Sequence, residues 1–118
     1  MKRGRSTGTP TKAQVARFEL IREFGCIACH SFDLHRLPEI HHLTIGGKHG
    51  QKRRGHDFTI GLCGWHHRGD TAFGNPDLAR LTYGPSYALE PRAFRETFGQ
   101  DDYLLAYQNR LIGQSEAA

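Results

Sequence analysis

The sequence lacks the long apolar runs of a membrane protein. Hydrophobic residues make up 37% of its 118 residues, and no run of 18 or more of them occurs to span a bilayer. The charged N-terminus has no apolar stretch behind it, so it does not match a secretory signal. A chain of this length forms one domain rather than two. We therefore expect a single-domain cytoplasmic protein with no membrane partner.

Cysteine is also scarce, and an odd count of three does not suit a framework of disulfides. The pair Cys26 and Cys29 is followed by Cys63, with His66 three positions further on. Two ligand pairs with this spacing are typical of a tetrahedral Cys3His zinc site. The sequence therefore predicts that these four residues bind a structural Zn2+. The alternative is that the cysteines are only small buried hydrophobic residues.

Histidine, by contrast, is abundant, and all eight histidines lie in the segment that holds the cysteines. His41 and His42 are neighbours in a short alternating segment, residues 39–43, that favours a strand. His67 follows His66 at a predicted helix start, and helical neighbours point about 100° apart, so His67 faces away from the zinc site. We expect one of His41 and His42 to bind a cation beside His67 and the other to lie nearby as a base.

The charge is unevenly distributed along the chain. Residues 1–56 hold 11 Lys and Arg against four Asp and Glu, whereas residues 57–118 hold five against eight. A basic half favours contact with a polyanion. Residues 46–56 form a glycine-rich basic loop between two predicted strands, which favours phosphate contacts over a merely solvated charge run. The candidate DNA-binding residues of this loop are Lys48, Lys52, Arg53 and Arg54.

Hydrophobic periodicity and the positions of glycine and proline predict an α+β fold. The first helix has Thr9 as its candidate N-cap, and its predicted buried face includes Ala13 and Ala16. The expected elements are a helix at about 10–24, a turn at 26–35, strands at 39–43 and 57–62, and helices that begin near 63, 76, 91 and 100. The expected divisions are a flexible basic arm at 1–9, one domain at 10–113 and a disordered tail at 114–118.

Three short blocks carry a resemblance to a known group of enzymes. The runs GCIAC at 25–29, IHHL at 40–43 and LCGWHH at 62–67 resemble those of the HNH, or ββα-metal, nucleases. Within that group the chain is similar to the phage Ref family of recombination-enhancement, RecA-dependent nucleases, over about residues 9–113. The resemblance implies a small zinc-stapled ββα-metal (HNH, treble-clef-like) core with flanking helices. It also implies DNA and a RecA filament as partners.

The resemblance assigns roles to individual histidines. It implies that His42 is the general base that takes a proton from the attacking water, and that His41 and His67 hold a catalytic divalent cation, Mg2+, Mn2+ or Zn2+. The three cysteines and His66 are again the ligands of the structural zinc. Phosphodiester hydrolysis needs a base that titrates near neutral pH and a cation that offsets negative charge, which agrees with these roles.

One position departs from the HNH pattern. No asparagine lies between His42 and the helix that ends the ββα unit. The two asparagines of the chain are Asn75 and Asn109. We predict that His56 or Asp57 braces the loop in its place. Asp70 lies within reach of the cation as a third ligand, a position that solvent can fill equally well.

The sequence therefore predicts a metal-dependent DNA endonuclease that hydrolyses phosphodiester bonds with little sequence specificity and is directed by a RecA filament in recombination. The alternative is a non-catalytic, zinc-stabilised nucleic-acid-binding module. No motif in the sequence indicates an oligomeric state.

Overall fold

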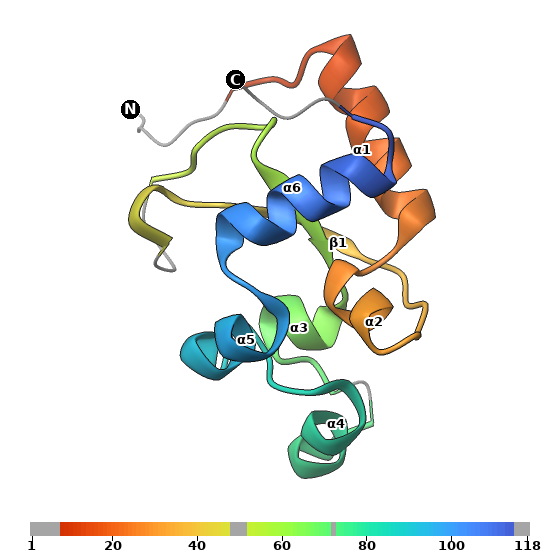
Figure 1. Ribbon diagram of the computed structural model, residues 1–118, viewed down its shortest axis with the longest axis vertical. Coiled ribbons are helices and arrows are strands. Elements are labelled where there is room, and N and C mark those ends of the chain that lie inside the picture. The colour runs from red at the N-terminus through yellow and green to blue at the C-terminus, as the bar shows by residue number, and fades with distance from the viewer. Residues whose placement is uncertain (1–7, 48–51, 72, 115–118) are drawn as a thin grey trace.

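The computed structural model describes residues 8–47, 52–71 and 73–114. Within them the chain forms a two-stranded sheet and six α-helices, which confirms the α+β class (Figure 1). Most of the predicted tail and most of the predicted basic arm lie outside the described residues. In chain order the elements are α1 (Lys12–Phe24), α2 (Ile27–Ser31), β1 (Glu39–His42), the 3-10 helix η1 (Ile45–Gly47), β2 (Thr59–Leu62), α3 (Gly64–Arg68), α4 (Pro76–Tyr83), α5 (Pro91–Phe98) and α6 (Asp101–Leu111).

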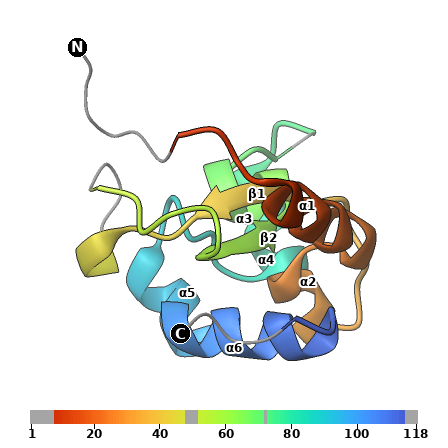
Figure 2. The same ribbon diagram turned by 90° about the horizontal axis from the view of Figure 1, so that it is seen from above.

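The two strands lie at the centre of the fold. β1 runs antiparallel to β2, with His41 opposite Ile60 and His42 opposite Thr59. All of β2 is buried, and Figure 2 shows the short sheet enclosed among α1, α3 and α6. Antiparallel pairing places successive side chains of β1 on opposite faces of the sheet. The sheet therefore separates the side chains of His41 and His42.

Helix α1 begins later than predicted. Thr11, and not Thr9, is the N-cap, because its hydroxyl accepts a hydrogen bond from the Gln14 N–H while the Gln14 side chain accepts one from the Thr11 N–H. This reciprocal capping box needs an acceptor side chain three residues after the cap. Lys12 would occupy that position after Thr9, and its ammonium group cannot accept. Gly25 ends the helix as predicted, at a φ of 105°.

The buried face of α1 also differs from the prediction. Ala13 and Ala16 are exposed, whereas Arg17 is 3% exposed and packs inward. The Arg17 guanidinium donates to the Thr59 hydroxyl at 3.1 Å, to the Thr59 carbonyl at 2.6 Å and to Asn109 Oδ1 at 2.7 Å. Hydrophobic periodicity missed this face because a charged residue enters the core only when its donors are satisfied there.

The outer edge of β2 is closed by side chains of α6 and α1. Gln108 accepts a hydrogen bond from the Gly61 N–H at 2.8 Å and donates to the Thr59 carbonyl at 3.0 Å, so its amide replaces a neighbouring strand. A buried strand edge needs such partners, since unpaired peptide groups are costly away from water. Gly61 also allows the close approach of α1, because a Cβ there would lie 2.7 Å from Ile21.

None of the helices in the described part of the chain combines the length and the apolar character that a bilayer span requires.

We expect Arg17→Met to lower the free energy of unfolding by about 3 kcal/mol, because the substitution leaves buried acceptors on Thr59 and Asn109 without their donor. Urea denaturation of the metal-loaded protein, followed by Trp65 fluorescence, measures the change. Arg22→Met is the matched control, since Arg22 is exposed on the same helix. Its effect should stay within about 0.5 kcal/mol. A loss below about 1 kcal/mol for Arg17→Met would contradict the structural role given to this residue.

Candidate metal centre and catalytic histidines

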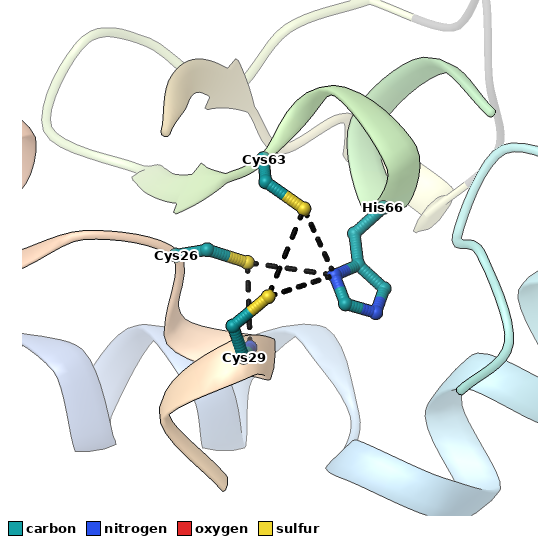
Figure 3. Close-up of side chains that lie close together, drawn as sticks. All are labelled: Cys26, Cys29, Cys63 and His66. Carbon is teal, nitrogen blue, oxygen red and sulfur yellow. Dashed lines mark hydrogen bonds between the residues drawn. The ribbon is translucent and has the colours of Figure 1, made fainter. Parts of the chain in front are cut away.

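The structure brings the four predicted zinc ligands together at two helix starts (Figure 3). Cys26 is the N-cap of α2 and Cys29 lies in its first turn, whereas Cys63 is the N-cap of α3 and His66 lies in that helix. All four side chains are buried, and their ligand atoms lie within 4.8 Å of one another. This cluster can hold a metal ion.

The distances within the cluster fit one tetrahedral ion. Zn–S bonds of about 2.3 Å and Zn–N bonds of about 2.0–2.1 Å place tetrahedral ligands about 3.8 Å apart for two sulfurs and about 3.6 Å apart for sulfur and nitrogen. The Sγ atoms of Cys29 and Cys63 are 3.8 Å apart. The three Sγ atoms lie 3.3, 3.5 and 3.8 Å from His66 Nδ1. The donor set and its spacing therefore suit zinc.

Groups around the cluster orient the ligands. His66 Nε2 donates to the Tyr83 carbonyl at 2.8 Å, so that Nδ1 is left as the metal-binding nitrogen. The Arg36 guanidinium donates to Cys63 Sγ at 3.4 Å, and the Cys29 N–H donates to Cys26 Sγ at 3.4 Å. With a divalent cation bound, three thiolates would leave a net negative charge, which the Arg36 guanidinium would offset.

A second group of histidines lies between β1 and α3. The rings of His41 and His67 are 5.0 Å apart between centroids and nearly perpendicular. His41 is buried and also packs against the ring of Tyr87 at 4.9 Å. Because His67 follows the zinc-ligand candidate His66 on a short helix, the two rings of α3 point to different sites. His41 is therefore the member of the His-His pair that lies beside His67.

The other member of the pair, His42, lies in a different environment. Its Nε2 is 2.9 Å from His56 Nδ1, and its ring is half-buried near Phe18. Burial, as the largest cause, and the positive charge of Arg53 together lower the pKa of His42 to about 4. Both effects disfavour the charged imidazolium. His42 is therefore a neutral imidazole at pH 7, which is the form that accepts a proton, but its pKa lies below the near-neutral value that we expected of the base.

Of the two predicted braces, the structure brings His56 to His42 and leaves Asp57 exposed. His56 Nε2 is 2.7 Å from the Gly8 carbonyl, which can only accept, so Nε2 carries a proton. In a neutral His56 the other nitrogen, Nδ1, then accepts from His42 Nε2–H. This arrangement leaves the lone pair of His42 on Nδ1.

The candidate DNA-binding residues differ in their surroundings. Lys52 and Arg53 are exposed, whereas Arg54 forms an ion pair with Asp102 at 2.7 Å. Lys48 lies outside the described residues. Asp70, the optional third ligand, contacts Arg68 at 3.5 Å.

The sequence analysis assigned no role to two residues that contact these histidines, Glu39 and Tyr87. Glu39 Oε1 lies 2.8 Å from His67 Nδ1, and Tyr87 supports the ring of His41 from a loop 46 residues downstream in the chain. The alternation of β1 places Glu39 and His41 on one face, which was a usable signal for Glu39. No local pattern indicates Tyr87, because its contact depends on the path of the loop after α4.

A family model described as "Recombination enhancement, RecA-dependent nuclease" matches residues 10–113, which is nearly the whole chain. No curated protein matches the sequence.

We expect the purified protein to hold one tightly bound metal ion and to unfold when a chelator removes it. The reason is that the free energy of binding at such sites, roughly 10–16 kcal/mol for zinc, is also folding free energy. Cys29→Ser should have the same effect as the chelator, and His30→Ala, at an exposed neighbouring position, should not. Elemental analysis together with circular dichroism measures both quantities. A metal-free protein that melts cooperatively near the temperature of the loaded form would rule out this role.

Proposed function

Since the chain belongs to the recombination enhancement, RecA-dependent nuclease family, we propose that it is a metal-dependent DNA endonuclease of the HNH, or ββα-metal, type. The order β1, β2, α3 supports the proposal, because it is a ββα unit with histidines on its first strand and its helix. The observation that carries it is the division of these histidines: His41 and His67 lie together, and His42 lies apart as a neutral base.

His42 acts as the general base in this proposal. Its half-buried ring stays neutral at pH 7, so it is ready to take a proton from an attacking water. The hydrogen bond to His56 holds the ring and leaves Nδ1 as the accepting atom. His56 in turn is held by the Gly8 carbonyl and by edge contact with Phe18. His56 therefore takes the place of the asparagine brace.

His41 and His67 hold the catalytic cation in this proposal. Two imidazoles that share one ion at bond angles of about 90–110° have ring centroids roughly 4.5–5.3 Å apart, and the observed 5.0 Å fits. When bound, the cation offsets negative charge on the scissile phosphate and on the leaving oxygen. Imidazole ligands suit Zn2+ and Mn2+ better than Mg2+, although Mg2+ with several waters also fits an open site.

The Cys3His cluster has a structural role in this proposal, with zinc as its ion. The ion joins α2 to α3 and so fixes the helix that carries His67. A domain with a two-stranded sheet has too small a core to hold so short a helix in place unaided. The zinc therefore positions one of the cation ligands without taking part in the chemistry.

DNA is the substrate, and the exposed Lys52 and Arg53 contact its phosphates. Lys48, on the same basic loop, is proposed to contribute as well. Phosphate contacts do not distinguish bases, so cutting has little sequence specificity by itself. A RecA filament directs the enzyme to its site, in line with the name of the family.

We expect the protein to cut DNA when a divalent cation is present, and His42→Ala to lower the rate by about 100-fold or more, the usual contribution of a general base. The measurement is the conversion of supercoiled plasmid to nicked or linear forms in Mg2+ or Mn2+, with and without a RecA filament. His35→Ala, at an exposed histidine, is the control. Retained DNA binding without cutting by the parent protein in every condition would favour the non-catalytic binding module instead. Equal rates for His42→Ala and the parent would remove His42 as the base.

We expect Lys52→Ala and Arg53→Ala each to weaken binding to any DNA sequence, because each removes one phosphate contact. Each should also reduce the slope of log K against log salt by about 1 in magnitude. Fluorescence anisotropy with a labelled duplex at several salt concentrations measures the slope of log K against log salt. Arg92→Ala, at an exposed arginine of α5, is the matched control. An unchanged slope for both variants would place the DNA elsewhere on the surface.

A further inference from the structure

A carboxylate lies against His67, which the proposed function makes a ligand of the catalytic cation. Glu39 Oε1 is 2.8 Å from His67 Nδ1. Arg68 donates a hydrogen bond to each oxygen of this carboxylate, so the carboxylate accepts from its partners and does not donate. His67 Nδ1 therefore carries the proton of this hydrogen bond. In the neutral ring the lone pair is then on Nε2.

Arg68 holds this carboxylate in a fixed orientation. Its Nε donates to Glu39 Oε1 at 2.8 Å and its Nη2 donates to Oε2 at 2.7 Å, so the pair is bidentate. The Glu39 side chain is 37% exposed and that of Arg68 54%, and an ion pair so exposed contributes little to folding stability. The geometry therefore serves orientation more than stability.

Strand β1 carries His41, one proposed cation ligand, and also Glu39, which contacts the other proposed ligand, His67. Glu39 and His41 are two positions apart on β1, so their side chains lie on one face of the sheet. His41 lies beside the ring of His67, and Glu39 contacts Nδ1 of that ring. One strand thus supplies a ligand and the group that orients the other ligand.

We propose that Glu39 is a positioning residue for the catalytic cation: it fixes His67 as the Nδ1–H tautomer, so that Nε2 binds the ion, and Arg68 keeps Glu39 in place. This inference rests on the proposed function, because it requires His67 to bind the cation. Histidine ligands of metals commonly donate their second ring N–H to a carboxylate, and loss of that partner weakens metal binding about 10–100-fold.

The first test measures cation binding without any cutting. Mn2+ is titrated calorimetrically into the zinc-loaded protein. We expect Glu39→Ala to raise the Kd for Mn2+ by about 10–100-fold and Arg68→Met to raise it less. Glu39→Gln should partly rescue binding, because the amide oxygen still accepts from His67 Nδ1–H. Glu90→Gln is the matched control, since Glu90 is 39% exposed and also pairs with an arginine, Arg80.

The second test measures the tautomer of His67 directly. Long-range 1H–15N spectra of the histidine rings should show His67 as the Nδ1–H form in the parent and as a mixture of forms in Glu39→Ala. A merely structural role for Glu39 would alter thermal stability and leave the tautomer unchanged. An unchanged spectrum of His67 in Glu39→Ala would overturn the inference.

His67→Ala separates failure of this inference from failure of the proposed function. If His67→Ala binds Mn2+ as tightly as the parent, or if the parent binds none, the proposed cation site is wrong and the inference falls with it. If His67→Ala loses Mn2+ while Glu39→Ala keeps the parent Kd, only the role of Glu39 is wrong. Zinc content and the melting temperature of each variant show that the domain is folded.

Discussion

The link between α2 and α3 through the Cys3His cluster is the interaction on which the rest of this structure depends. A two-stranded sheet has few neighbours to hold it, and the short helix α3 cannot hold its place by its own hydrogen bonds. The cluster fixes α3, and α3 fixes the loop that follows α4. Two side chains of α3 donate hydrogen bonds there: His66 to the carbonyl of Tyr83, at the end of α4, and Trp65 to the carbonyl of Gly84. In return, the Ser86 hydroxyl donates to the Trp65 carbonyl.

The same attachment reaches the candidate catalytic histidines. The Tyr87 N–H donates to the His66 carbonyl, and the Tyr87 ring lies against His41. Its hydroxyl is held by Arg95 at 2.6 Å and by Asp101. The metal cluster and the proposed cation site thus share one rigid frame. Hydrogen bonding and ring packing through Tyr87 connect the two sites.

Adjacent histidines acquire different properties from their surroundings rather than from their own chemistry. His41 and His42 are identical neighbours, yet β alternation sends one toward α3 and the other toward α1. Burial and nearby Arg53 keep His42 neutral. The Glu39 carboxylate lies 2.8 Å from His67 Nδ1. The proposed base and the proposed cation ligand are therefore one residue type, and they differ because each imidazole has a different partner.

The sequence by itself determined the Cys3His cluster, the α+β class and the family, because each depends on spacing within short segments: two pairs three residues apart, or alternation over a few positions. The prediction of Thr9 as the N-cap of α1 was wrong, because the capping box is made by Thr11 and Gln14, and the sequence did not indicate the burial of Arg17. The sequence also left open whether His56 or Asp57 contacts His42. Only the tertiary structure decided the places of Arg17 and His56, because their partners are far apart from them in the chain and folding brings them within hydrogen-bonding distance.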